Sequence, residues 1–140
     1  MPESHVHATL VSLLLRFLHE RHGRNLGLCV YRDTATAHRE DKPRRINGYV
    51  PDILALTVPA SFTIIGEAKL HQDLETPHSR SQLRAFLRFL RYSPDPHMML
   101  AVPVAAHASA FGLMQRLQWN EDAANVEVEI VTPAALLRGS

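Results

Sequence analysis

The spacing of hydrophobic residues divides the chain into helical and extended segments. Apolar residues recur at intervals of three and four between residues 5 and 22, which predicts an amphipathic helix. The same period predicts two more helices, over residues 79–92 and 105–118. Short apolar or alternating runs predict strands over residues 27–32, 49–58, 62–70, 98–104 and 125–131. The predicted order is therefore α-β-β-β-α-β-α-β.

Two connections constrain how these elements are joined. Pro59-Ala60-Ser61 separates two strands, which predicts a hairpin. The helix over 79–92 leads into the run 98–104, which is continuously apolar, as in a strand buried on both faces. A strand, a helix and a second such strand imply a parallel pair with a right-handed crossover. With no repeat, low-complexity tract or linker, the sequence predicts one α/β domain over residues 1–140.

The predicted hairpin carries the candidate chemistry. Glu67 and Lys69 lie on one face of their strand, because strand side chains alternate. A turn centred between Pro59 and Ala60 places Asp52 opposite Glu67, about 5 Å apart at Cβ, whereas a turn centred on Ala60 shifts Asp52 by one residue. Two facing carboxylates repel unless they share a proton or bind a cation. Their hard oxygen atoms suit Mg²⁺ or Mn²⁺.

Two polar residues on the predicted helices extend this group. At about 100° per residue, Glu20 continues the stripe of Leu10 and Phe17, where a carboxylate is costly without a partner. Alternatively, the helix frays near Gly23 and Glu20 reaches solvent. Gln82 lies beside the inward stripe of the next helix, where it either orients a phosphate or a water or is an ordinary boundary residue.

This arrangement resembles the signature of the PD-(D/E)XK nuclease superfamily. Fourteen residues separate Pro51-Asp52 from Glu67-Ala68-Lys69, with Glu20 before them and Gln82 after them. The segment over residues 67–90 is similar to the VRR-NUC branch, although Leu70-His71 stands where that branch has Gly-Pro. Archaeal Holliday-junction resolvases share the small size and the helical glutamate.

The resemblance implies a fold and a set of roles. The fold is a three-layer, restriction-endonuclease-like α-β-β-β-α-β core with a mixed central sheet, and the activity is hydrolysis of DNA phosphodiester bonds, including those of branched or junction DNA. Glu20, Asp52, Glu67 and the carbonyl of Ala68 would hold the metal. Lys69 would orient the attacking water or stabilise charge on the phosphate. The implied catalytic residues are Asp52, Glu67, Lys69 and Gln82.

The distribution of positive charge along the chain suggests which residues contact nucleic acid. The whole chain is nearly neutral, with 15 Lys and Arg against 14 Asp and Glu, but four cations gather between residues 39 and 45. We expect this polar segment to be a basic loop that contacts phosphates. A stripe of four arginines on the helix 79–92 either follows a nucleic-acid backbone or is a solvated face. The predicted contacts are Arg39, Lys42, Arg44, Arg45 and Arg80.

Other features exclude several classes of protein. A single cysteine, Cys29, excludes an intramolecular disulfide and a thiolate zinc site. The pairs His5/His7 and His19/His22 lack a third ligand in register, which disfavours a histidine zinc site. The longest apolar run is too short to span a membrane, and the first residues do not form a signal peptide. We therefore expect a cytoplasmic protein with no membrane partner.

Three hypotheses follow. The first is a Mg²⁺-dependent DNA endonuclease that acts as a homodimer, because a chain of 140 residues needs a second subunit to span a duplex or junction. The second is a non-cleaving module that keeps the nuclease fold and binds nucleic acid or protein. The third is a structural domain with a chance motif. The first requires Glu20, Asp52, Glu67 and Lys69 to converge on one open pocket, whereas a distant Glu20 and a Gln82 buried among apolar groups favour the second.

Overall fold

The predicted order of elements is confirmed in a computed structural model of the chain, which describes residues 5–25 and 27–133. The main elements are α1 (His5–His22), β1 (Leu28–Arg32), β2 (Ile53–Thr57), β3 (Thr63–Ala68), α2 (Pro77–Leu90), β4 (Pro96–Ala101), α3 (His107–Asn120) and β5 (Glu127–Val131). Short 3₁₀ turns lie at η1 (Arg39–Asp41), η2 (His71–Asp73) and η3 (Val104–Ala106). The domain is therefore α/β, with a central sheet and helices packed on it.

The strands form one mixed sheet in the order β1-β2-β3-β4-β5. β1, β2 and β3 are antiparallel neighbours, whereas β3, β4 and β5 run parallel, so the predicted parallel pair across α2 is confirmed. These directions bring the carboxyl ends of β1, β3, β4 and β5 to the same end of the sheet as the amino end of β2. The β2–β3 turn lies at the opposite end.

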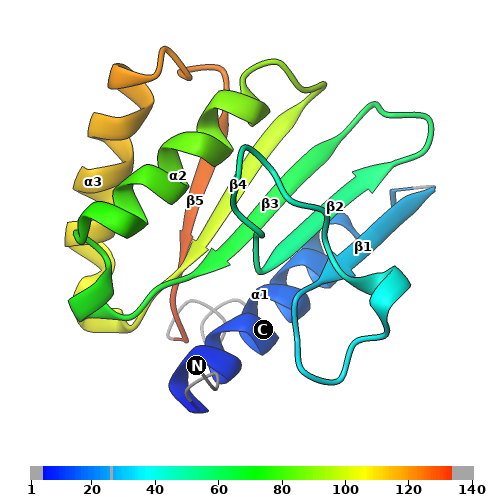
Figure 1. Cartoon of the computed structure of the whole chain (residues 1–140), viewed down its shortest axis with the longest axis horizontal. Coiled ribbons are helices and arrows are strands. Elements are labelled where there is room, and N and C mark those ends of the chain that lie inside the picture. Colours follow the sequence, from blue (N-terminus) through cyan, green and yellow to red (C-terminus); the bar gives the residue numbers. More distant parts are fainter. Residues whose placement is uncertain (1–4, 26, 134–140) are drawn as a thin grey trace.

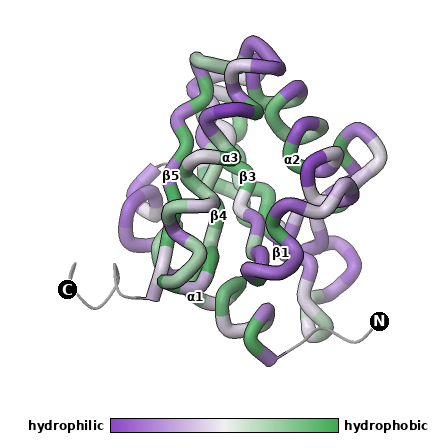
Figure 2. Tube along the Cα trace, turned by 90° about the vertical axis from the view of Figure 1, so that its left-hand side faces the viewer, coloured by the Kyte–Doolittle hydropathy of each residue, from purple (hydrophilic) through white to green (hydrophobic). Residues whose placement is uncertain are grey.

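The helices cover both faces of the sheet (Figure 1). α1 packs on one face, and α2 and α3 pack on the other. Successive residues of β3 serve different faces, since Ile64 packs with α1 and Ile65 with α2 and α3. The central strands are hydrophobic and the peripheral connections hydrophilic (Figure 2). A Cβ on Gly66 would lie 3.2 Å from Ile53 Cβ and 3.6 Å from Leu14 Cδ1, so the missing side chain lets α1 pack closely on β3.

The β2–β3 hairpin adopts the first of the two registers considered above. Ile53 pairs with Gly66, which brings Asp52 level with Glu67 at the next position. The turn is held by Thr57, whose Oγ1 accepts hydrogen bonds from the backbone N–H groups of the turn at 2.9 and 3.1 Å. The hairpin therefore delivers two carboxylates to one end of the sheet.

The helix α2 begins slightly earlier than expected because its cap is Thr76. Thr76 Oγ1 accepts from the backbone N–H of Ser79 at 3.1 Å, and Pro77 occupies the first turn, where its missing N–H costs nothing. The predicted inward stripe of α2, which includes Leu83 and Phe86, is buried. Over the described ranges, no helix has both the length and the apolar composition that crossing a membrane requires.

Candidate active site

Asp52 and Glu67 form a buried carboxylate pair at the end of the hairpin. The backbone N–H of Asp52 donates to Glu67 Oε1 at 2.9 Å, and the backbone N–H of Ala68 donates to Asp52 Oδ2 at 2.8 Å. Asp52 is 9% exposed and Glu67 only 2%. Each acid is thus fixed by the backbone of the strand that carries the other. The register alone places the two side chains next to each other.

The electrostatics of this pair are unfavourable for two free anions. Burial raises the pKa of Glu67 well above its ordinary range, and the neighbouring Asp52 charge raises it further. The Lys69 ammonium acts in the opposite direction and lowers the pKa of Glu67. Desolvation is the largest of these effects, so Glu67 binds a proton more tightly than an exposed glutamate does.

Lys69 and Gln82 join the pair from β3 and α2. Lys69 Nζ lies 3.6 Å from Glu67 Oε2 and donates a hydrogen bond to Gln82 Oε1. The Lys69 side chain is only 11% exposed, and Gln82 is 9% exposed. Gln82 is therefore buried but hydrogen-bonded, and it holds the lysine ammonium beside Glu67.

The first helix brings His7, rather than Glu20, to this group. His7 Nε2 lies 3.3 Å from Asp52 Oδ2. Of the two interpretations of Glu20, burial on the helix face is wrong and exposure to solvent is confirmed. At about 1.5 Å per residue, Glu20 lies about 20 Å farther along α1 than His7. Of the residues expected to converge, Asp52, Glu67 and Lys69 do, and Glu20 does not.

The phase of α1 explains this difference. At about 100° per residue, Val6 shares the predicted stripe with Leu10 and Phe17, but Val6 is 51% exposed. The buried face consists instead of Leu10, Val11, Leu14, Phe17 and Leu18. A run of three leucines at residues 13–15 allows either phase on periodicity alone. The signal that could have identified His7 is its place one turn before Leu10, on the stripe that leads to Leu14.

The predicted basic segment is anchored to α2. Asn47 Nδ2 donates to a backbone oxygen of α2 at 3.0 Å, and the Arg44 guanidinium lies 5.2 Å from the centroid of the Phe89 ring. Arg45 Nη1 donates to the backbone oxygen of Gly48 at 3.0 Å. This packing presents a defined basic surface rather than a separate loop. Its four predicted cations are all exposed: Arg39, Lys42, Arg44 and Arg45.

The arginine stripe of α2 divides into two parts. Three of its members meet Glu121, which follows α3. Arg88 Nε lies 2.5 Å from Glu121 Oε1, Arg84 Nε lies 3.9 Å from Oε2, and Arg91 Nη1 donates to the Glu121 backbone oxygen at 2.6 Å. These arginines join the ends of α2 and α3. Arg80 is exposed near the amino end of α2 and remains a candidate contact.

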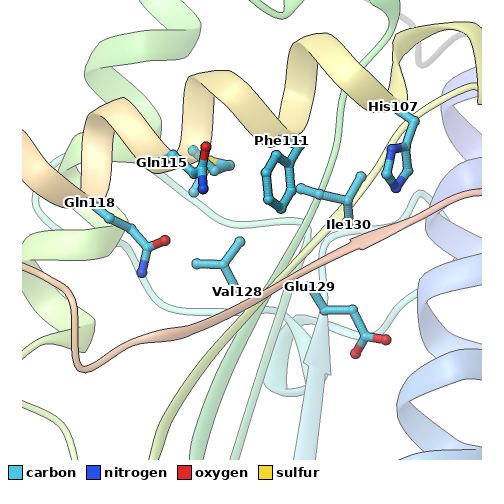
Figure 3. A pocket seen from close by; sticks show the side chains of 8 residues that line it. His107, Phe111, Gln115, Gln118, Val128, Glu129 and Ile130 are labelled. Atoms are coloured by element: carbon cyan, nitrogen blue, oxygen red, sulfur yellow. The ribbon is translucent and has the colours of Figure 1, made fainter.

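A pocket of about 350 Å³ lies away from this group, between α3 and β5 (Figure 3). Phe111, Val128 and Ile130 form its apolar wall, and Gln115 and Gln118 lie along its rim. None of the predicted site residues lines it. The carboxylate pair and Lys69 are instead packed between the sheet and the helices, with little exposed surface.

Neither models of known families, nor curated proteins, nor solved structures match the chain. Within residues 5–25 and 27–133, no group of three or more His, Cys, Asp or Glu side chains is arranged to hold a metal ion. The candidate site therefore consists of the Asp52–Glu67 pair and its neighbours.

Proposed function

We propose that the chain is a metal-dependent nuclease of the PD-(D/E)XK type that hydrolyses phosphodiester bonds of DNA. The observation that carries this proposal is the buried pair of Asp52 and Glu67 with Lys69 beside it, in the hairpin register that the signature requires. A mixed sheet with α1 on one face and α2 on the other is compatible with a restriction-endonuclease-like core.

The carboxylate pair suits Mg²⁺ or Mn²⁺. Burial and mutual repulsion raise the pKa of Glu67, and a divalent cation would compensate both charges. Asp52, Glu67 and the carbonyl of Ala68 would hold it. Mg²⁺ uses one or two carboxylates and keeps several waters, so a third acidic side chain is not needed. When bound, the ion would lower the pKa of a water and neutralise charge on the phosphate.

The neighbouring side chains have distinct roles in this proposal. Lys69 supplies a fixed positive charge beside Glu67, where it stabilises negative charge on a phosphate oxygen. Gln82 positions the Lys69 ammonium through its hydrogen bond. His7 contacts Asp52 and fixes the orientation of that carboxylate. The exposed cations, including Arg39 and Arg80, bind the DNA backbone at a distance from the reacting phosphate.

Cleavage of labelled DNA tests the proposal. Duplex, flap and four-way DNA are incubated with the protein in Mg²⁺, Mn²⁺ or EDTA, and we expect cleavage with a metal only. Lys69→Ala should abolish cleavage while folding and metal binding persist, because Lys69 is not a metal ligand. Glu20→Gln is the matched control and should cleave at the wild-type rate. Absence of cleavage by the wild type on every DNA and with both metals would reject the nuclease proposal.

The second candidate is a non-cleaving module with the same fold. The exposure of Glu20, far from Asp52, favours it, because the site then lacks one of the acids that the signature supplies. It predicts DNA binding with no cleavage and no effect of metal on binding. A gel-shift titration on the same DNA substrates separates the two candidates.

We further propose that the chain acts as a homodimer, because one 15.7 kDa domain contacts only a short stretch of duplex. Sedimentation equilibrium measures this directly. A mass of a single chain at micromolar concentration, with and without DNA, would contradict it.

A further inference from the structure

A further pocket with several polar lining residues lies near the carboxylate pair. It lies between α1 and the segment that follows β1, and its volume is about 300 Å³. Its polar lining consists of Ser12, Arg32, Thr34 and Thr36. The apolar remainder comes from Ala8, Val11 and Leu15 of α1 and from Ala35. None of the four polar residues was predicted as a site residue from the sequence.

The lining has the chemistry of an oxyanion site. One arginine and three hydroxyl-bearing residues are among the lining residues, and no carboxylate is. Arg16 follows Ser12 by one helical turn and adds a second positive charge on the same side of α1. Guanidinium groups bind phosphate through two parallel hydrogen bonds, and hydroxyls donate to the remaining oxygens.

Thr34 provides an independent indication of a ligand. Its Oγ1 is buried and has no hydrogen-bond partner within the described part of the chain. Buried hydroxyls in folded proteins nearly always have a partner, so an orphan is unusual. This hydroxyl has almost no exposed surface in the observed conformation, so it would donate to an oxyanion in the pocket after its side chain turns toward the pocket.

The pocket is coupled to the candidate active site through two short contacts. The backbone N–H of Asp33, which lies between Arg32 and Thr34, donates to the Asp52 backbone oxygen at 2.9 Å. On the other wall, Ala8 lines the pocket and its neighbour His7 contacts Asp52. A group bound here is therefore held next to Asp52.

We propose that Arg32, Thr34, Thr36 and Ser12 bind a phosphate group adjacent to the one at the carboxylate pair. The inference rests on the proposed function in one respect, namely that the phosphate belongs to a DNA strand. A free phosphate ion has the same chemistry, and the experiment separates the two sources.

The first arm titrates inorganic phosphate into ¹⁵N-labelled protein in EDTA, at ionic strength held constant with chloride. We expect saturable shifts of the amides of residues 8–12 and 32–36. Arg32→Gln should weaken the affinity about tenfold or more, because it removes a charge-assisted pair, and Thr34→Val should weaken it less. Arg24→Gln, an exposed arginine beyond the far end of α1, is the matched control and should bind as the wild type does. Shifts that do not saturate, or that persist in Arg32→Gln, overturn the proposal.

The second arm adds a short single-stranded oligonucleotide, still in EDTA so that it is not cleaved. If the pocket binds a phosphate of a DNA strand, the oligonucleotide should displace inorganic phosphate, and Arg32→Gln should weaken binding of the oligonucleotide. Saturable phosphate binding with no competition would overturn the assignment to DNA. Because neither arm requires cleavage, a protein that never cuts DNA can still satisfy both. Conversely, a protein that cuts DNA but shows no phosphate shift refutes this inference alone.

Discussion

Replacing Asp52 in two ways separates its charge from its hydrogen bond. In the wild type, the backbone N–H of Ala68 donates to Asp52 Oδ2 at 2.8 Å. Asp52→Asn removes the negative charge next to Glu67 but keeps an oxygen that can accept this hydrogen bond. Asp52→Ala removes both. If Asp52 binds a cation, removing its charge should not lower the stability of the metal-free protein. If Asp52 stabilises the fold, removing its charge should lower that stability.

The magnitudes follow from the geometry. The Cβ atoms of facing strand residues lie about 5 Å apart. Two full charges at that separation repel by about 3 kcal/mol at an effective dielectric constant of about 20. This is an upper limit, because the raised pKa of Glu67 lets a proton relieve the repulsion. Leaving the buried Ala68 N–H without an acceptor costs about 1–3 kcal/mol. We expect Asp52→Asn to be at least as stable as the wild type without metal, and Asp52→Ala to be less stable than Asp52→Asn by about 1–3 kcal/mol. In a domain of this size, each kcal/mol moves the Tm by about 3–5 °C.

The pH dependence has a definite sign. Because the pKa of Glu67 is raised in the folded state, the folded protein holds this proton more tightly than the unfolded chain does. The stabilising contribution is present at low pH and is lost as the pH rises from the ordinary range of a glutamate through the raised pKa. Asp52→Asn removes one cause of the raised pKa, so the loss should be smaller in that variant.

Thermal melting of the three proteins between pH 5 and 9, in EDTA and in millimolar Mg²⁺, measures these effects. Mg²⁺ should raise the Tm of the wild type, because an ion that binds only the folded state stabilises it, and should barely move that of Asp52→Asn. The reasoning is refuted if Asp52→Asn melts well below the wild type in EDTA and metal moves neither curve. The Asp52 charge would then stabilise the fold, through its contact with His7, rather than serve a bound cation.

Three further predictions concern the surface, a histidine and the core. Replacing Arg44 and Arg45 by glutamine should weaken DNA binding regardless of sequence and reduce the slope of log K against log salt by about 1–2, measured by fluorescence anisotropy; an unchanged slope would show that these arginines do not contact phosphates. Burial, and after it the charge of His97, lower the pKa of His22 in the folded state. The free energy of unfolding should therefore decrease as the pH falls from the ordinary pKa range of a histidine through that lowered pKa. Urea unfolding between pH 7.5 and 5 should show this loss in the wild type relative to His22→Gln, and parallel curves would contradict it. Phe86→Ala should cost about 3–5 kcal/mol in the same assay, and a loss below about 1 kcal/mol would mean that the α2 core is not tightly packed.

Local rules were sufficient for much of the fold. The alternation of side chains and the short turn reduced the hairpin to two registers, and the structure adopts the one that pairs Ile53 with Gly66. Burial could not decide between them in advance, because both faces of β2 and β3 are covered. The inward face of α2 was also readable, since Leu83 and Phe86 belong to a single unambiguous stripe. Element ends were less predictable. β2 begins at Ile53 rather than near residue 49, because Ile46 and Tyr49 pair with each other in a separate tight turn.

The candidate site was predictable where one hairpin determines it and not where helix packing does. Glu67 and Lys69 follow from strand alternation, and Asp52 joins them in one of the two hairpin registers considered. The rotation of α1 against the sheet depends on how its leucines fit around Gly66, which periodicity does not encode, so His7 was missed and Glu20 was misplaced. The Lys69–Gln82 hydrogen bond likewise depends on where α2 crosses β3.

The antiparallel β2–β3 hairpin places its turn at one end of the sheet and the carboxylate pair at the other, so the turn can be modified chemically without touching the pair. The six residues of β3 span about 20 Å, so the exposed turn at Ala60 lies that far from Asp52. Cys29 is the one native thiol and is half-buried. A cysteine introduced by Ala60→Cys would therefore give a point of attachment for a fluorophore or a surface tether. Single molecules held by this turn would present the carboxylate end of the sheet to solution unobstructed.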